Sequence, residues 1–173
     1  LKKNGFTPIT IDRHIERPGH ATFGPQFQVD LPKDQSYLDE IIKRYDIQSC
    51  IHFAGSASVG ESVKNPSKYY KNNVVATLAL LDQLVQNNIK TFIFSSSAAV
   101  YGDPGNRKCR EDRGPNPINP YGVTKLIVER MLMDYKTAYG ISSVSLRYFN
   151  AAGADPEAEI GELRDNETHL IPL

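Results

Sequence analysis

The stretch TFIFSSS, residues 91–97, reads as a buried β-strand that runs out into three serines. Its short apolar run is typical of a strand in the interior of a parallel sheet, and it predicts a strand over residues 91–95. Four further short strands are predicted at residues 9–12, 27–31, 47–54 and 143–147. Helical patterns separate most of them, and this alternation predicts an α/β fold, a Rossmann-like doubly wound parallel sheet.

Three helices are predicted between these strands. A Ser36-x-x-Asp39 pattern resembles a capping box and predicts a helix from Ser36 to about residue 45. Apolar residues at helical spacing predict a long helix over residues 66–88, and a third over residues 121–139 is closed by Gly140. Residues 102–120 are rich in glycine, proline and charge, so they are predicted to be a loop, and loops of this length are often functional.

A tyrosine and a lysine four residues apart open the third helix. Residues at this spacing share a helical face, so Lys125 is predicted to lie beside Tyr121. A tyrosine hydroxyl ordinarily has a pKa of about 10, and a nearby positive charge favours the phenolate. Ser97, near the carboxyl end of the strand at 91–95, can hold a substrate oxygen. We therefore predict that Tyr121 removes a proton from a carbinol while a nicotinamide takes the hydride.

Residues at the strand ends indicate where a dinucleotide would bind. Asp12 ends the first strand, where an acid bonds the adenosine ribose and repels a 2′-phosphate, so NAD is favoured over NADP. A turn acid explains Asp12 equally well, and the adjacent Arg13 keeps NADP open. Asp30-Leu31 fits either the adenine edge or a turn. Phe53-Ala54-Gly55 ends a strand with small residues, which lets a cofactor approach the backbone.

Composition excludes several classes of protein. The chain has 173 residues, 40% of them hydrophobic, with zero net charge, which favours one domain with a core and gives no sign of nucleic-acid or membrane binding. No apolar run approaches the ~18 residues of a membrane span and no signal peptide is visible, so we expect a cytoplasmic protein. With only two cysteines, Cys50 and Cys109, in a chain of this length, we expect no disulfide framework. No metal site is expected because metal-ligand spacing is absent among His14, His20, His52 and His169.

We expect the chain to be an internal piece of a longer protein. It lacks an initiator Met, and the glycine-rich turn that should precede the first strand is absent. Residues 1–150 are predicted to be a partial NAD-binding Rossmann domain, and residues 151–173 the start of a substrate-binding region. The chain by itself is therefore not expected to form a stable NAD-binding monomer.

Six motifs together resemble the UDP-glucose 4-epimerases of the extended short-chain dehydrogenase/reductase family, and they cover nearly the whole chain. In order, they are Ile51-His52-Phe53-Ala54-Gly55, Val59-Gly60-Glu61-Ser62, Tyr69-Tyr70-Lys71-Asn72-Asn73, Phe94-Ser95-Ser96-Ser97-Ala98-Ala99-Val100-Tyr101-Gly102, Asn119-Pro120-Tyr121-Gly122-Val123-Thr124-Lys125 and Arg147-Tyr148-Phe149-Asn150.

The resemblance implies an isomerase that uses tightly bound NAD to interconvert UDP-glucose and UDP-galactose in galactose metabolism. Tyr121 would be the base, Lys125 its electrostatic helper and a ligand of the nicotinamide ribose, and Ser97 the partner of the sugar hydroxyl. Residues that would contact NAD are Asp12, Asp30, Leu31, Phe53, Ala54, Gly55, Asn73, Tyr121, Lys125 and Phe149. Asn150 would meet the UDP-sugar and Leu170 the uracil. A homodimer through the helices at 66–88 and 121–139 is also implied.

The sequence departs from the family pattern at three places. Ser56-Ala57 stand where a lysine is frequent, Ala99 replaces a frequent threonine, and His169 replaces a frequent asparagine. A sugar-nucleotide dehydratase would need an acid–base pair just after the strand serines, and Ala98-Ala99 there argue against one. An epimerase for another UDP-sugar, such as an N-acetylhexosamine or a pentose, and a non-catalytic NAD-binding relative stay open.

Overall fold

The computed structural model describes residues 4–15 and 24–153 of the chain. These residues fall into two units, one formed by the described residues up to Asp30 together with 150–153, the other by residues 31–149. Every strand pair within the described residues is parallel: β1 with β2 in the first unit, and the order β3-β4-β5 in the second. Parallel strands that alternate with helices confirm the predicted α/β class.

The first unit holds a short parallel pair. Strand β1 spans Thr10–Asp12 and β2 spans Gln26–Gln28, with Ile11 opposite Phe27. The Val29 backbone N–H donates to the Asp12 carbonyl at 3.0 Å, which extends the pairing just past the strands. The predicted second strand, 27–31, was therefore placed too far along the chain, because parallel pairing with β1 stops near Val29.

The sheet of the second unit consists of β3 (Ser49–His52), β4 (Thr91–Ser97) and β5 (Ser142–Tyr148). Phe92, Phe94 and Ser96 alternate along β4 and are buried on one of its faces. The three serines continue the strand instead of following it, so the predicted end at residue 95 was two residues short. Pairing with β5 explains this, since it runs the full length of β4 and ends with Ser97 opposite Tyr148.

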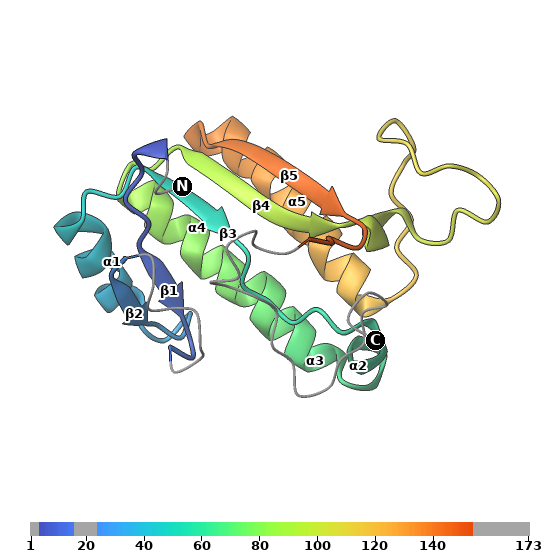
Figure 1. Ribbon diagram of the computed structural model, residues 1–173, viewed down its shortest axis with the longest axis horizontal. Helices are drawn as coiled ribbons and strands as arrows, with labels where there is room; N and C mark the ends of the chain where they lie inside the picture. The colour runs from blue at the N-terminus through green and yellow to red at the C-terminus, as the bar shows by residue number, and fades with distance from the viewer. Residues whose placement is uncertain (1–3, 16–23, 154–173) are drawn as a thin grey trace. The chain divides into compact units, whose positions relative to one another are not determined.

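Three helices supply most of the apolar side chains packed in the second unit. Helix α5 (Pro120–Tyr139) lies against β4 and β5, and α4 (Ala76–Gln86) packs beside α5 and next to α1 (Gln35–Arg44) (Figure 1). Buried apolar residues of these helices are Leu38, Ile41, Ile42, Ala79, Leu81, Leu84, Val128 and Leu132. Within the described residues, no helix combines the length and the apolar character needed to cross a bilayer.

The predicted capping box at Ser36 is wrong. Helix α1 already begins at Gln35, after Asp34, and no side chain caps its first turn. Asp39, the expected partner of Ser36, instead forms an ion pair with Lys43 at 2.6 Å and accepts a hydrogen bond from Asn87 at 2.8 Å. The Asp39 carboxylate, which the local pattern assigned to the cap, therefore binds Asn87 at the end of α4 instead.

The predicted helix at 66–88 consists of three consecutive segments. They are α3 (Pro66–Tyr69), a π-helical segment η3 (Tyr70–Val75) and α4. A preceding short helix, α2 (Val59–Lys64), was not predicted. Its signal was present in the sequence, because the Ser58 hydroxyl caps α2 by accepting the Glu61 N–H at 3.3 Å.

Helix α5 has the caps that its sequence indicates. The Asn119 side chain accepts the Gly122 N–H at 2.8 Å and Pro120 occupies the first turn, so the helix begins one residue before the predicted start. Gly140 ends the helix in the left-handed region, with φ of 72°. The cap at Asn119 places Tyr121 in the first turn, where the predicted chemistry requires it.

Candidate active site

The candidate site lies where the end of β4 meets the first turns of α5, inside the second unit. Lys125 is only 5% exposed, and its ammonium donates to the Ser95 carbonyl at 2.7 Å. The Lys125 nitrogen lies 5.8 Å from the centroid of the Tyr121 ring, on the same helical face. Burial lowers the pKa of Lys125 to about 8, so the side chain still carries its charge at neutral pH.

The Tyr121 ring is held from two directions. Lys125 lies beside it, and Tyr69 of α3 contacts it edge to face, with ring centroids 6.4 Å apart and an interplanar angle of 82°. The Tyr121 backbone carbonyl accepts a 2.7 Å hydrogen bond from the Thr124 hydroxyl. Tyr121 as a whole is only partly buried, so this residue is not enclosed in the core.

Ser97 ends β4 and caps the short 3₁₀-helix η4 (Ala98–Tyr101). Its hydroxyl oxygen accepts the Ala99 N–H at 3.1 Å, which leaves the hydroxyl hydrogen to donate elsewhere. The first turn of α5 packs directly on η4. A Cβ at Gly122 would lie 2.6 Å from the Ala99 carbonyl oxygen, so only glycine allows this close approach of the Tyr121 helix to the segment after Ser97.

Beyond β3, residues Phe53, Ala54 and Gly55 are exposed. Gly55 has φ of 149°, and a Cβ there would lie 3.0 Å from the Asn73 side-chain oxygen and 3.9 Å from the Lys125 nitrogen. Because Gly55 has no side chain, its backbone is not covered by one, and it lies close to the buried Lys125 ammonium. This arrangement fits the predicted approach of a dinucleotide to residues 53–55.

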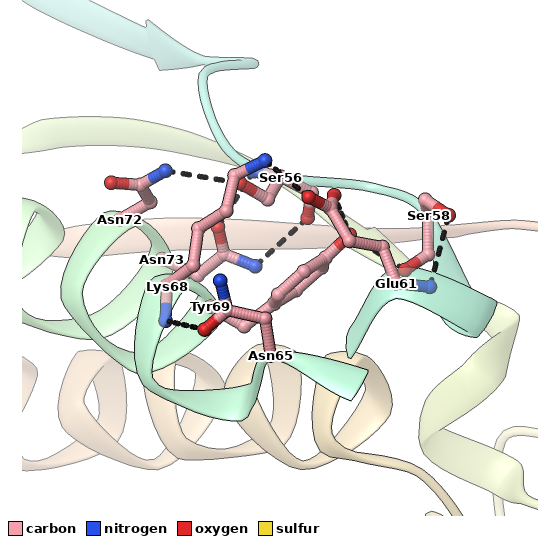
Figure 2. A network of polar contacts seen from close by, with 8 residues as sticks. All are labelled: Ser56, Ser58, Glu61, Asn65, Lys68, Tyr69, Asn72 and Asn73. Atoms are coloured by element: carbon pink, nitrogen blue, oxygen red, sulfur yellow. Dashed lines mark hydrogen bonds and ion pairs between the residues drawn. The ribbon is translucent and has the colours of Figure 1, made fainter. Parts of the chain in front are cut away.

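Asn73 lies in the π-helical segment η3, and its side chain is almost completely buried. Its oxygen accepts the Ser56 N–H at 2.8 Å, and its amide nitrogen donates to the Ser56 carbonyl at 3.0 Å (Figure 2). The same nitrogen donates to the Thr124 hydroxyl, also at 3.0 Å. Both amide hydrogens are thus used within the protein, and a cofactor could bond only to the oxygen. π-Helical turns often mark functional sites, which agrees with this position.

Ser56 is held in place by its neighbours on η3. The Ser56 backbone donates one hydrogen bond to the Asn73 side chain and accepts another from it. The Ser56 hydroxyl accepts a 3.0 Å hydrogen bond from the Asn72 amide (Figure 2). Asn72 and Asn73 thus hold the loop after β3 in place. The departure from lysine at this position therefore places a fixed, uncharged residue in the loop.

The other predicted contact residues belong to the first unit, to other segments of the second unit, or to the residues outside the described part of the chain. In the first unit, the Asp12 carboxylate accepts the His14 N–H at 2.8 Å, and Asp30 forms a 2.7 Å ion pair with Arg13, while Asn150 is exposed. In the second unit, Leu31 is half-buried and Phe149 is exposed directly after β5. Leu170 and His169 lie outside the described residues.

His52 is a buried histidine of the core whose Nε2 has a hydrogen-bond partner. Its Nε2 lies 2.8 Å from the Thr77 hydroxyl, which itself donates to the Asn73 carbonyl at 2.7 Å, so His52 must be the donor. Burial, with a smaller contribution from the charge of Lys125, lowers the pKa of His52 to about 4. The ring is therefore neutral at neutral pH. Among the described residues, no group of three or more His, Cys, Asp or Glu side chains could hold a metal ion.

An ion pair that the sequence analysis missed joins α5 to the ends of β4 and β5. Arg147 of β5 donates two hydrogen bonds to the Glu129 carboxylate, at 3.0 and 2.7 Å, and Glu129 also accepts from the Ser96 hydroxyl. The Arg147 guanidinium lies 4.8 Å from the centroid of the Tyr101 ring. A signal existed in the sequence, because Glu129 extends the four-residue spacing of Tyr121 and Lys125 along the same face.

Comparison with known proteins identifies relatives of this chain. The family model described as GDP-mannose 4,6 dehydratase matches residues 9–163. The UDP-glucose 4-epimerase of Halalkalibacterium halodurans is 48% identical over 100% of this chain and 52% of its own length. The chain thus spans about half the length of the curated relatives it matches.

The solved structures that resemble this chain include UDP-glucose 4-epimerases as well. The UDP-glucose 4-epimerase from Brucella ovis in complex with NAD superposes with a TM-score of 0.92 at 47% identity, covering 99% of this chain and 53% of that one. The enzyme from Bifidobacterium longum in complex with NAD⁺ and UDP has a TM-score of 0.86 at 35% identity, covering 94% of this chain and 51% of that one. The predicted Rossmann-like class, incomplete with respect to these structures, is confirmed.

Proposed function

Because this chain belongs to the GDP-mannose 4,6 dehydratase family, and its relatives there are UDP-glucose 4-epimerases, we propose that the protein containing it is an NAD-dependent epimerase that interconverts UDP-glucose and UDP-galactose. The observation that carries the proposal is the Tyr121–Lys125 pair at the start of α5, packed through Gly122 against the segment that follows Ser97. The proposal includes a cytoplasmic location and a homodimer. Exposed apolar side chains such as Leu78 on α4 and Met133 on α5 support the homodimer.

The residues of the site have distinct tasks in this reaction. Tyr121 takes the proton of the sugar 4′-hydroxyl, and the hydroxyl of Ser97 donates to the same oxygen. Lys125, charged and buried, favours the phenolate form of Tyr121. Gly55, Asn73 and Lys125 would hold NAD, which when bound accepts the C4′ hydride and later returns it. Tyr121 would keep the proton while the sugar is a 4-keto sugar, and it would give this proton back to the 4′-oxygen as the epimer forms.

A dehydratase is the activity named in the description of the matching family model, but it fits the site less well. Elimination of water from the sugar needs an acid–base pair next to the oxidised carbon. Ala98 and Ala99, which begin η4, carry no ionisable group, and Tyr101 is buried against Arg147. The geometry therefore favours an epimerase.

An assay of the full-length protein against a panel of UDP-sugars tests the proposal. We expect turnover of UDP-galactose to UDP-glucose without added reductant or net NADH formation, because the hydride returns to the sugar. Higher kcat/KM with a UDP-N-acetylhexosamine or a UDP-pentose would reassign the sugar. NAD binding without turnover of any UDP-sugar would show a non-catalytic relative instead.

Replacing Lys125 with methionine is expected to move the acid limb of the pH–rate profile upward by about one pH unit, with about tenfold lower activity at neutral pH. The sign follows from the charge: below a pKa of about 8 the Lys125 ammonium favours the phenolate, and methionine lacks that charge. Lys136→Met, an exposed position on the same helix, is the control. A profile identical to that of the parent would exclude this role for Lys125.

Asp12→Asn is expected to lower the preference for NAD over NADP by about tenfold, because it removes the carboxylate that repels a 2′-phosphate. The ion pair of Arg13 with Asp30 adds support, since that cation is already engaged by a carboxylate. Dissociation constants of both dinucleotides provide the measurement, and Asp46→Asn, at an exposed position, is the control. Equal affinity of the parent protein for NAD and NADP would show that Asp12 does not face the adenosine ribose.

A further inference from the structure

Tyr69 and Glu61 lie in two of the motifs described above, and the proposed reaction gives neither of them a task. Tyr69 ends α3 and is 0% exposed. Its hydroxyl lies 2.6 Å from the Ser58 carbonyl oxygen and 2.9 Å from a Glu61 carboxylate oxygen, so its single hydrogen is shared between two acceptors (Figure 2). Burial, followed by Glu61, raises the pKa of Tyr69 to about 12, so the hydroxyl keeps this hydrogen.

Glu61 is itself fixed by a second contact. Its other carboxylate oxygen pairs with the Lys68 ammonium at 2.5 Å, across the turn between α2 and α3 (Figure 2). This contact, more than any other, lowers the pKa of Glu61, so the carboxylate is ionised at neutral pH. The Tyr69 hydroxyl is therefore anchored to both the N-cap residue and the first turn of α2, and the end of the Tyr69 side chain cannot shift without breaking these bonds.

The Tyr69 ring contacts Tyr121, the proposed base of the reaction. The Tyr69 ring meets the Tyr121 ring edge to face, in the range of favourable aromatic pairs. Tyr121 is only partly buried, so the direction of its hydroxyl depends on a few neighbours. A displacement of about 1 Å at a reacting group can cost about 100-fold in rate.

We propose that Tyr69 is a positioning residue for Tyr121, with its ring setting the direction of the Tyr121 hydroxyl and its own hydroxyl held by Ser58 and Glu61. The inference rests on the proposed function, because it assigns a task relative to the base of that reaction. It predicts that loss of the Tyr69 hydroxyl impairs the chemical step more than substrate binding.

The test uses the full-length protein and two pairs of variants. Tyr69→Phe keeps the ring and removes the anchor, and Tyr70→Phe, at the neighbouring position with a 39% exposed side chain, is its control. Glu61→Gln keeps an oxygen that can accept from Tyr69, whereas Glu61→Leu removes it. We expect kcat to fall about tenfold in Tyr69→Phe and Glu61→Leu, with KM for the UDP-sugar within about twofold of the parent. Tyr70→Phe and Glu61→Gln should stay within about twofold in both constants.

A second measurement does not depend on turnover. The near-ultraviolet absorbance of tyrosinate is titrated in the parent and in Tyr69→Phe, each against the same protein carrying Tyr121→Phe, which isolates the Tyr121 phenolate. In Tyr69→Phe we expect this phenolate to form at higher pH. Without the anchored Tyr69 ring, the Tyr121 ring would lie farther from the Lys125 charge that favours the phenolate. If the parent turns over no UDP-sugar, the proposed function fails, and the titration alone decides the positioning role.

Thermal unfolding identifies variants that are damaged as a whole. If Tyr69→Phe does not fold, the Glu61→Leu and Glu61→Gln pair decides by the same kinetic comparison. Unchanged kcat together with an unchanged Tyr121 titration in Tyr69→Phe overturns the proposal. An equal loss in Tyr70→Phe overturns it as well, because the effect would then be general to this turn.

Discussion

Tyr121→Phe in the full-length protein is expected to lower kcat by a factor of about 10²–10⁴, the usual contribution of a general base, while NAD and UDP still bind. The ring of Tyr121 contacts Tyr69 and Lys125, and phenylalanine preserves both ring contacts. The substitution therefore removes the proton acceptor and leaves the shape of the site unchanged. Steady-state kinetics with UDP-galactose, together with dissociation constants for NAD and UDP, measure the two effects separately.

The control for this variant lies at the far end of the same helix. Tyr139 is an exposed tyrosine in the last turn of α5, and Tyr139→Phe should leave turnover and binding unchanged. Near-normal turnover in Tyr121→Phe would contradict the proposed mechanism, since a group other than Tyr121 would then have to take the 4′-hydroxyl proton. Loss of NAD binding in the same variant would instead assign Tyr121 to the cofactor.

Glu129→Leu is expected to lower the free energy of unfolding by about 3 kcal/mol, because Arg147 would remain largely buried without its partner. The Glu129 side chain is 10% exposed and that of Arg147 is 23% exposed, so solvent can compensate only part of the loss. The hydrogen bonds that Arg147 donates to Glu129 raise the pKa of Arg147 further in the parent protein. Without them an arginine side chain is still protonated, so the variant keeps a charge that has lost its partner. Urea unfolding of the full-length protein gives the value.

Two comparisons make this prediction specific. Asp134→Leu breaks an exposed pair on the same helix, Arg130–Asp134, whose side chains are 71% and 63% exposed, and should cost less than about 1 kcal/mol. The double variant Glu129→Leu/Arg147→Met should recover much of the lost stability, because no unpaired charge remains. Equal effects of Glu129→Leu and Asp134→Leu would mean that the Glu129–Arg147 pair is not held away from solvent.

Local patterns were sufficient for much of the fold and for the central pair of the site. The four-residue spacing of Tyr121 and Lys125 fixes their shared helical face, and Gly140 ends their helix because it tolerates positive φ. The apolar run of β4 likewise identified a buried strand. The extent of the serine run in β4 was misplaced because it depends on pairing with β5, and the cap assigned to Ser36 was wrong because Asp39 is engaged by Asn87 from α4. Helix α2 was missed although its cap, Ser58, is a local signal.

What the sequence determined by itself is therefore the periodic part: the alternation of strands and helices, the caps of α5, and the placing of Tyr121 and Lys125 on one face. Tertiary structure alone decided which polar groups meet across distant segments. Asn73 fastens Ser56, Glu129 pairs with Arg147, and Tyr69 joins Glu61 to the Tyr121 ring. The physical reason is that backbone periodicity is a local property, whereas a buried polar side chain takes whichever partner the packing of distant elements brings within hydrogen-bonding distance.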